Sequence, residues 1–550
     1  MSTLSVTASG PAADAVAAHV PDLVAAGFAS KLFAQDATLW GPDAESESTI
    51  RLSWVGLPRS SRPLVGEIAA IRDDLTSKGL DHVVLCGMGG SSLAPEVICA
   101  TAGKAITILD SSDPDYVRAA LADRLATSIV VVSSKSGSTV ETDSQRRVYE
   151  GAFREAGHDP ADHLVIVTDP GSPLDKEARE AGYRVVNADP HVGGRYSALT
   201  AFGLVPSGLA GVDIEALLDD AESVADLLAE DDDANPGLRL GAAMAGTDPL
   251  RDKFVIVDDG SGITGFADWA EQLIAESTGK SGTGILPVVV TGDEDPEVQH
   301  PTADITVARL VGEGDDEGDD TAHEVDGSRS EVHVGGSLGA QMLLWEVATA
   351  AAGRILGINP FDQPDVESAK KAARELLGTS AGTSSAPAAT DGAVEIRALG
   401  GDWLGDATTV DAALQALFAQ LDPARGYVAI MAYLDRLVDA PLAHSRRAVA
   451  LRTGRPTTFG WGPRFLHSTG QFHKGGPATG VYVQVTTAPH EDLSIPGREF
   501  TFGDFIASQA GGDAAVLADH GRPVLQLHLT DHDAGLAQVS AALGIPAGGA

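Results

Sequence analysis

The sequence predicts an α/β protein with two doubly wound parallel sheets and a further C-terminal α/β segment. Short, continuously apolar runs such as His82–Cys86 and Ile129–Val132 have the pattern of strands that are buried on both faces. Each of these runs leads into a loop of small residues and then into a segment with helical spacing. Strands that alternate with helices in this way indicate a parallel sheet covered by helices on both faces.

The chain of 550 residues is longer than one hydrophobic core usually accommodates, so we expect several domains. An acidic turn at Glu230–Asp233, after an amphipathic helix, marks a boundary, and a stretch rich in Ser, Thr, Ala and Gly marks a linker. We expect these segments: 1–60, helical and connecting; 61–225, the first sheet domain; 226–377, the second sheet domain; 378–392, the linker; and 393–550, the C-terminal α/β region.

The formal net charge of −40 disfavours nucleic acids and anionic membrane surfaces as partners. We attribute the acid excess to solubility or to a salt-rich host. The sequence has no run of 18 apolar residues and no secretory signal pattern at its start, so we expect a soluble, cytoplasmic protein without membrane contact. Two cysteines, Cys86 and Cys99, are too few for a disulfide framework or a metal knuckle.

The first 60 residues carry weak signals: Ala12–Ala29 has helical spacing, and no chemistry is assigned to Trp40–Trp54. An amphipathic helix at Ser61–Lys78 leads into the first sheet. The strands of this sheet are predicted at His82–Cys86, Ala105–Leu109, Ile129–Val132, His163–Val167 and Tyr183–Val186.

Two small-residue loops follow strands of this sheet. Gly87–Ser92 (GMGGSS) follows the first strand, and Ser133–Thr139 (SSKSGST) follows the third. Loops at the carboxyl ends of parallel strands, each leading into a helix, are suited to hold a phosphate with backbone N–H groups and hydroxyls. A dinucleotide site is the alternative, but the third glycine of its fingerprint would fall at Ser92.

Another glycine pair, Gly193-Gly194, precedes Arg195 and an apolar helix that we expect at Ala198–Leu204, closed by Pro206. The glycines allow a close backbone approach to a ligand, and the arginine supplies a planar cationic donor. Since the net charge repels an anionic ligand, local cations must offset it. The motifs supply Lys135, Arg195, Lys280 and Lys370.

The second sheet domain has the same alternation. Strands are predicted at Lys253–Val257, Ile285–Val290 and Ile305–Leu310. Helices are predicted at Phe266–Ala275, leading into Glu276, at Gly335–Ala352 and at Val366–Leu377. By itself, Glu276 has the pattern of a surface glutamate at a helix end.

The C-terminal region has buried strands at Tyr427–Ala432 and Val481–Val485. The loop at 460–477 between them contains His467 and His473, two cations and several glycines, a composition more typical of a ligand site than of a connection. A metal site is the alternative, and it is disfavoured because no cysteine or carboxylate accompanies the two histidines.

Four motifs in this order resemble the glucose-6-phosphate isomerase family, which is built from two sugar-isomerase (SIS) domains. They are Gly87–Ser92, Ser133–Thr142, Gly193–Ser197 and Glu276–Lys280. The stretches 359–371 (NPFDQPDVESAKK) and 462–477 (GPRFLHSTGQFHKGGP) are similar to the isomerase half of bacterial transaldolase–isomerase fusions. The resemblance extends from about residue 50 to the C-terminus.

The resemblance implies roles for particular residues. Glu276 matches the base that moves the proton, Arg195 the arginine near the enediolate, and Lys370 a lysine that assists ring opening. The substrate-binding residues it implies are Gly90, Ser91, Ser134, Lys135, Ser136, Thr139 and Gln363.

The sequence departs from the family at one point. The family's ring-opening histidine follows the catalytic glutamate in a helical motif, but His300, the first histidine after Glu276, lies in an acidic loop without that motif. We therefore assign ring opening to His473 or His467, in the same chain or across a dimer interface, because histidine both gives and accepts protons near neutral pH. The alternative is that both histidines only order their loop.

The resemblance implies an aldose–ketose isomerase that interconverts glucose 6-phosphate and fructose 6-phosphate in glycolysis and gluconeogenesis. We expect no cofactor and no metal, a sugar-phosphate substrate and a homodimer. A dual-specificity phosphoglucose/phosphomannose isomerase stays open as an alternative. A non-catalytic SIS-type sugar-phosphate-binding regulator is disfavoured, because it would need neither Glu276 nor Lys370 nor a second domain. A nucleotide-dependent dehydrogenase is disfavoured by the missing third glycine.

Overall fold

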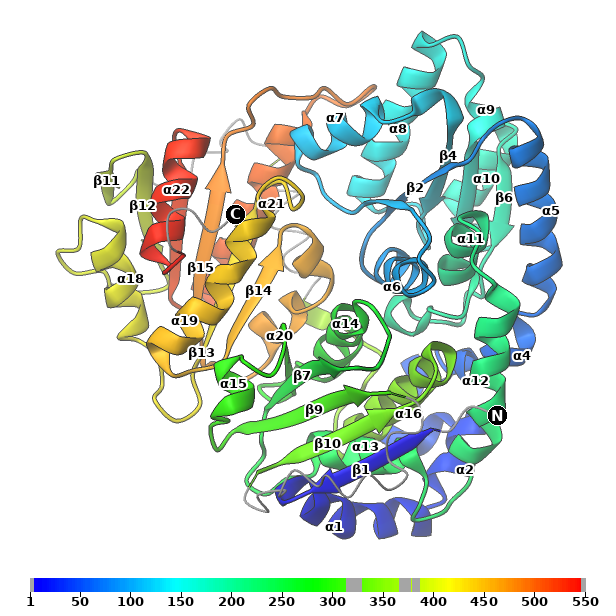
Figure 1. Ribbon diagram of the computed structural model, residues 1–550, viewed down its shortest axis with the longest axis horizontal. Coiled ribbons are helices and arrows are strands. Elements are labelled where there is room, and N and C mark those ends of the chain that lie inside the picture. The colour runs from blue at the N-terminus through cyan, green and yellow to red at the C-terminus, as the bar shows by residue number, and fades with distance from the viewer. Residues whose placement is uncertain (1–3, 313–328, 366–376, 378–385, 546–550) are drawn as a thin grey trace.

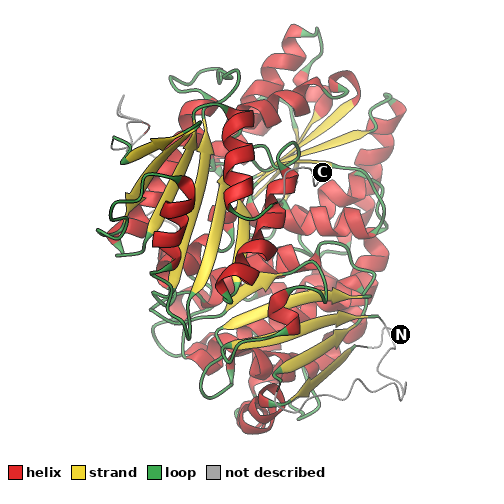
Figure 2. Ribbon diagram, turned by 60° about the vertical axis from the view of Figure 1, so that its left-hand side comes forward, coloured by secondary structure: helices red, strands yellow, loops and turns green. Residues whose placement is uncertain are grey.

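The computed structural model describes residues 4–312, 329–365, 377 and 386–545. In these ranges the strands form three sheets, which lie in three separate parts of the molecule (Figure 1). Helices pack along the sheets, as the view coloured by secondary structure shows (Figure 2). The α/β class with doubly wound parallel sheets, predicted from the sequence, is confirmed.

The first sheet has the strand order β3-β2-β4-β5-β6, and all of its pairings are parallel. It confirms all five strands predicted here, with ends shifted by at most two residues. Its strands are β2 (His82–Gly87), β3 (Thr107–Leu109), β4 (Ser128–Ser133), β5 (Leu164–Thr168) and β6 (Arg184–Asn187). The accompanying helices are α5 (Pro63–Ser77), α6 (Leu93–Thr101), α7 (Pro114–Ala122), α8 (Val140–Glu155), α9 (Pro160–His163), α10 (Pro173–Glu180) and α11 (Ala201–Leu209).

The second sheet has the order β1-β10-β9-β7-β8, parallel except for β1, which pairs antiparallel with β10. Its strands are β1 (Ser5–Ser9), β7 (Lys253–Asp259), β8 (Leu286–Val289), β9 (Ile305–Val311) and β10 (Glu331–Gly335). The helices of this part are α12 (Ile214–Leu228), α13 (Pro236–Ala245), α14 (Phe266–Thr278), α15 (Pro296–Gln299) and α16 (Leu338–Leu356).

The third sheet has the order β11-β12-β16-β15-β13-β14, with a parallel core from β16 to β14 and antiparallel pairing at β12. Its strands are β11 (Ala389–Asp391), β12 (Val394–Leu399), β13 (Tyr427–Tyr433), β14 (Thr457–Trp461), β15 (Gly480–Thr487) and β16 (Val524–Leu529). The helices are α18 (Val410–Phe418), α19 (Ser445–Thr453), α20 (Gly470–Gly475), α21 (Phe502–Asp519) and α22 (His532–Ala542).

The N-terminal segment differs from the expectation of helices and connections. It contains α1 (Pro11–Ala25), α2 (Phe28–Phe33), α3 (Glu45–Ser48) and α4 (Leu57–Ser60). It also supplies β1 to the edge of the second sheet, next to α1, which packs against α13. Because β1 is only five residues long and pairs with a strand more than 300 residues away, its local pattern gave no signal.

Two local expectations are wrong. Pro206 does not close the helix after Arg195; it lies inside α11, which continues to Leu209. The expected linker 378–392 contains a strand at its end, since Ala389–Asp391 pairs with β12. The helix predicted at Val366–Leu377 lies outside the described residues except for Leu377, and so does Lys370. The division into domains stays a prediction.

The second and third sheets share a hydrophobic core. Val255 and Val288 of the second sheet belong to the same buried cluster as Tyr427 and Tyr482 of the third, together with Phe472 of α20. This packing places α20 against α14, near the middle of the molecule, where α6 also meets α14 (Figure 1). No helix of the described part of the chain is both long and apolar enough to cross a membrane.

Candidate active site

The loops after β2 and β6 meet through their glycines. Gly89–Ser91 and Gly194–Tyr196 each form a 3-10 turn. A Cβ atom added at Gly90 would lie 2.0 Å from the carbonyl oxygen of Gly194, so only glycine fits at Gly90. This contact brings Ser91 and Arg195 into one region.

The serine-rich loop is ordered by its own hydroxyls. Gly137 N–H donates to Ser134 Oγ at 3.2 Å, and Ser134 Oγ donates to Thr139 Oγ1 at 3.4 Å. The hydroxyls of Ser136 and Ser138 lie 2.6 Å apart on the exposed side. Helix α8 begins immediately afterwards, at Val140. Hydroxyls and a helix N-terminus in this arrangement can bind a phosphate.

Lys135 is held at the base of this loop. Its ammonium donates to the carbonyl oxygens of Pro190 and Val192, both at 3.0 Å, and pairs with Asp169 at 2.8 Å. The side chain is about one-third exposed. These contacts fix the cation beside the loop that precedes Arg195.

The Arg195 guanidinium is almost fully buried and contacts two other parts of the chain, helix α14 and residues 360–363. Nη1 contacts Glu276 Oε2 at 3.4 Å and donates to Gln363 Oε1 at 3.0 Å. Nη2 donates to the carbonyl oxygens of Pro360 at 2.9 Å and Asp362 at 2.8 Å. Arg195, Glu276 and Gln363 are therefore brought together.

Glu276 lies in the last turn of α14 and is buried, so it is not the surface residue that its local sequence suggests. Its Oε2 also accepts a hydrogen bond from Gln272 Nε2, one helical turn earlier, at 3.3 Å. These contacts hold the buried carboxylate in one orientation, as a group that accepts a proton at a fixed position requires.

A pocket of about 120 Å³ opens beside Arg195. Lys135 and Arg51, both cationic, also line it. These three cations can attract an anion to the pocket, although each also has a carboxylate partner, which is Glu47 for Arg51, Asp169 for Lys135 and Glu276 for Arg195. The lining residues are Arg51, Lys135, Gly193, Gly194, Arg195, Tyr196, Phe361 and Gln363.

The two histidines of the C-terminal loop have different surroundings. His467 is half-buried, and its Nε2 lies 3.3 Å from Oε1 of Glu141 in the first turn of α8. A Cβ atom at Gly89 would lie 3.0 Å from Cβ of His467, so this histidine adjoins the loop after β2 as well as the first turn of α8.

His473 is not brought to this region. Its ring stacks on Tyr427, and its Nδ1 lies 3.0 Å from the Tyr427 hydroxyl. Burial, with Lys474 and Arg522 nearby, holds the pKa of His473 well below its ordinary value. The imidazole therefore stays neutral and packs in an aromatic core, where it contributes to the structure of the third sheet's part of the molecule.

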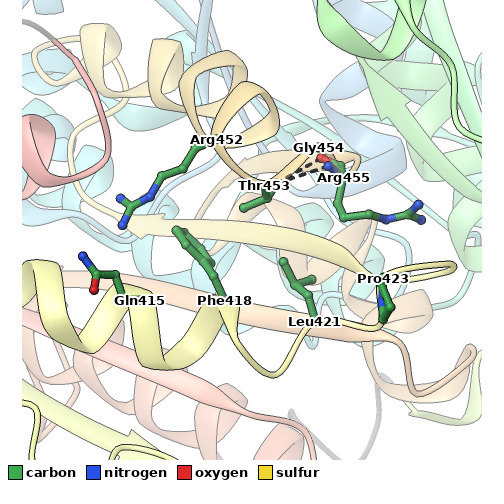
Figure 3. A pocket seen from close by; sticks show the side chains of 8 residues that line it. All are labelled: Gln415, Phe418, Leu421, Pro423, Arg452, Thr453, Gly454 and Arg455. Atoms are coloured by element: carbon green, nitrogen blue, oxygen red, sulfur yellow. Dashed lines mark hydrogen bonds between the residues drawn. The ribbon is translucent and has the colours of Figure 1, made fainter.

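A larger hollow of about 440 Å³ lies in the third sheet's part of the molecule (Figure 3). Its walls come from α18 and α19, with Phe418 and Arg452 facing across it. None of the predicted site residues lines it. We assign the site to the smaller pocket, because that pocket adjoins Arg195 and Lys135.

Sequence reasoning missed Arg51, Gln272 and Glu141. Arg51 lies in a stretch with no motif, and only the tertiary fold brings it to the pocket. Gln272 precedes Glu276 by four residues, a helical spacing that could have indicated the contact. Among the described residues, no group of three or more His, Cys, Asp or Glu side chains is arranged to hold a metal ion.

Comparisons with known proteins agree on one family. A family model described as phosphoglucose isomerase matches residues 67–235. A probable glucose-6-phosphate isomerase of Natronomonas pharaonis is 30% identical over 373 residues, which cover 60% of this chain and 87% of the relative. A glucose-6-phosphate isomerase of Rippkaea orientalis is 29% identical over 352 residues, covering 55% of this chain and 67% of the relative.

A solved structure supports the fold. The crystal structure of a hypothetical protein from Thermus thermophilus superposes with a TM-score of 0.56 and 24% identity. The match covers 68% of this chain and 100% of that protein.

Proposed function

This chain belongs to the phosphoglucose isomerase family, and we propose that it is an aldose–ketose isomerase that interconverts glucose 6-phosphate and fructose 6-phosphate in glycolysis and gluconeogenesis. The observation that carries this proposal is the buried contact between Glu276 and Arg195 beside a pocket lined by cations. This arrangement offers a base, a charge stabiliser and an anion site in one place.

The phosphate of the substrate would bind at the two loops. Backbone N–H groups and the hydroxyls of Ser91, Ser134, Ser136 and Thr139 supply donors, and the N-terminus of α8 adds a favourable dipole. Gly90 lets the loops approach each other closely, and Lys135 offsets the negative charge.

The proton transfer would use Glu276. Its carboxylate takes the proton from C2 of the open-chain aldose and returns it to C1, while a second proton passes from O2 to O1 to give the ketose. The guanidinium of Arg195 stabilises the negative charge that develops on the enediolate oxygen. Gln363 orients that guanidinium through its 3.0 Å hydrogen bond.

Ring opening would use His467 in preference to His473. His467 adjoins the loop after β2 and has the carboxylate of Glu141 in α8 at 3.3 Å, which can hold the imidazole in one orientation. Lys370 keeps the role that the family resemblance implies. We also propose a homodimer and a cytoplasmic location, which follow from the same resemblance.

A non-catalytic sugar-phosphate regulator would need the phosphate loops but not a buried base. The contact of Glu276 with Arg195 therefore favours the enzyme. The comparisons do not favour an isomerase that also accepts mannose 6-phosphate, which would have to tolerate both configurations at C2.

An assay of chelator-treated protein for conversion of fructose 6-phosphate to glucose 6-phosphate tests the proposal. We expect turnover without added metal, and a parallel assay with mannose 6-phosphate decides between the two specificities. Absence of turnover on every sugar phosphate, with the phosphate still bound, would favour the regulator. Activity that is lost in chelator and restored by a divalent ion would contradict the metal-independent mechanism.

A further inference from the structure

Two buried cations bind the same turn of the chain, residues 359–362. Lys280 Nζ donates to the carbonyl oxygen of Asn359 at 2.7 Å and to that of Asp362 at 2.6 Å. Arg195 Nη2 donates to the carbonyl oxygens of Pro360 and Asp362. The carbonyl of Asp362 is thus shared by both cations.

The ammonium of Lys280 has a complete set of partners. Besides the two carbonyl oxygens, it donates to Oδ1 of Asp362 at 2.6 Å. An ammonium has three N–H groups, and here three oxygens accept them. The side chain is only 3% exposed, whereas that of Asp362 is 40% exposed. Lys280 therefore fixes the turn from the inside.

The orientation of Arg195 depends on this turn. Three of its four nitrogen–oxygen contacts are made to residues 360–363, and the fourth is made to Glu276. The remaining nitrogen, Nε, has no hydrogen-bond partner among the described residues. If the turn moved, the guanidinium would lose two of its four contacts, and Gln363, the next residue along the chain, would be displaced with the turn.

We propose that Lys280 and Asp362 are positioning residues for the isomerisation: by fixing the turn 359–362, they hold the guanidinium of Arg195 in place against Glu276. This inference rests on the proposed function. Neither residue needs to touch the substrate, and their effect reaches the reaction through Arg195. A shift of about one ångström in such a group can reduce a rate strongly, because catalysis depends on preorganised charge.

The proposal is tested with Lys280→Met and a matched control, Lys253→Met. Lys253 is also fully buried and also has three oxygen acceptors: Asp252 Oδ1 at 2.8 Å, the Arg425 carbonyl at 2.7 Å and Asp304 Oδ2 at 3.2 Å. Both variants are expected to lower the melting temperature. We expect only Lys280→Met to lower kcat, by about 10-fold or more, with KM changed less than about 3-fold.

Two further variants keep the test decisive if Lys280→Met does not fold. Asp362→Ala removes one acceptor from a half-exposed position and should lower kcat in the same way, by a smaller factor. Lys280→Arg keeps a charged donor and should retain more activity than Lys280→Met. The proposal would be overturned if the variants of Lys280 and Asp362 had the same kcat as the control Lys253→Met.

The wild-type protein separates this proposal from the proposed function. If the wild type does not isomerise a sugar phosphate, the proposed function fails. If the wild type isomerises and the variants of the turn do so equally well, only the positioning role fails. A loss confined to KM would also overturn it, because it would assign the turn to substrate binding.

Discussion

The guanidinium of Arg195 lies 3.4 Å from Oε2 of Glu276, and the two side chains are only 4% and 6% exposed. The contact joins the loop after β6 to the end of α14, so it connects the first sheet's part of the chain to the second's. A buried charge pair is stable only where hydrogen bonds satisfy both groups. Here Gln272 and the turn 359–362 supply them.

The first prediction concerns the base. Glu276→Gln keeps the shape and a hydrogen-bond acceptor for Arg195 but removes the basic carboxylate. We expect kcat to fall by at least about 10²-fold, the low end for general-base catalysis. Exchange of the C2 proton with solvent deuterium, followed during turnover, should fall in parallel.

A matched control for this substitution is Glu297→Gln. Glu297 is also buried and also pairs with an arginine, Arg446, at 2.7 Å, but it lies in α15 near the third sheet. We expect Glu297→Gln to change the free energy of unfolding but to leave the exchange of the C2 proton with solvent unchanged. If exchange persists in Glu276→Gln, the base is another residue.

The second prediction concerns the phosphate loop. The double variant Ser134→Ala/Thr139→Ala removes two hydroxyls that lie 3.4 Å apart. Since each hydrogen bond to a charged group contributes roughly 1.5–3 kcal/mol, the loss of two should raise KM by at least about 10²-fold. Ser207→Ala, which removes a buried hydroxyl inside α11, serves as the control. An unchanged KM in the double variant would refute the assignment.

The third prediction separates the two histidines. His467→Ala should reduce turnover of the cyclic sugar far more than turnover of a pre-opened analogue, because only the cyclic form needs ring opening. His473→Ala should mainly lower the melting temperature, since its ring packs on Tyr427. Equal losses of His467→Ala on both substrates would exclude its role in ring opening.

Much of the fold could be predicted because parallel strands carry their signal locally. The continuous apolar runs of β2 and β4 are buried on both faces, and each is followed by a loop of small residues. The strand β1 could not be predicted in this way, because its place depends on pairing with β10, whose sequence is more than 300 residues away.

The candidate site stays a prediction, but the sequence indicated part of the arrangement that the structure shows. The motifs identified Arg195 and Glu276, which the fold brings into contact. The position of Arg51 in the pocket lining could not be foreseen, since no motif marks this residue and only the packing of the N-terminal segment brings it there. The two histidines of one loop looked equivalent in sequence, but helix α20 turns His473 toward the aromatic core.

The fourth prediction concerns Arg51. If its guanidinium attracts the phosphate, Arg51→Ala should raise KM by about 10-fold, the effect of one charge-assisted hydrogen bond. Raising the ionic strength should reduce this difference by screening. Arg59→Ala is the control, because Arg59 pairs with Glu222 and Asp226 on the surface of the same N-terminal segment. Equal KM values for the two variants would exclude Arg51 from the site.

The last prediction concerns pH. Burial, and then the nearby charge of Arg195, lower the pKa of Lys280 from 10.5 to about 8, while Asp362 and Glu276 oppose this shift. Above a pH of about 8 the amine has two N–H groups for three acceptors, so the turn 359–362 loosens. We expect kcat of the wild type to fall as the pH rises through about 8, and this limb should be absent in Lys280→Arg, because a guanidinium stays charged.

The free energy of unfolding should rise over the pH range in which kcat falls. Between a pH of about 8 and 10.5 the unfolded chain still binds the proton that the folded protein has released, so the free energy of unfolding gains a term that rises with pH. The gain is limited to about 3 kcal/mol by the difference between the two pKa values. Denaturant unfolding measures this gain when the free energy of unfolding is determined for the wild type and for Lys280→Met, each at a pH of about 7.5 and about 9.5. The difference between the two proteins isolates Lys280, because the contributions of the other titrating groups cancel. Burial disfavours the charged ammonium of Lys280, but the turn 359–362 needs that ammonium for its hydrogen bonds. We therefore expect kcat to fall over the same pH range in which the free energy of unfolding rises. A difference that stays constant or decreases with pH would show that Lys280 keeps its proton in the folded protein.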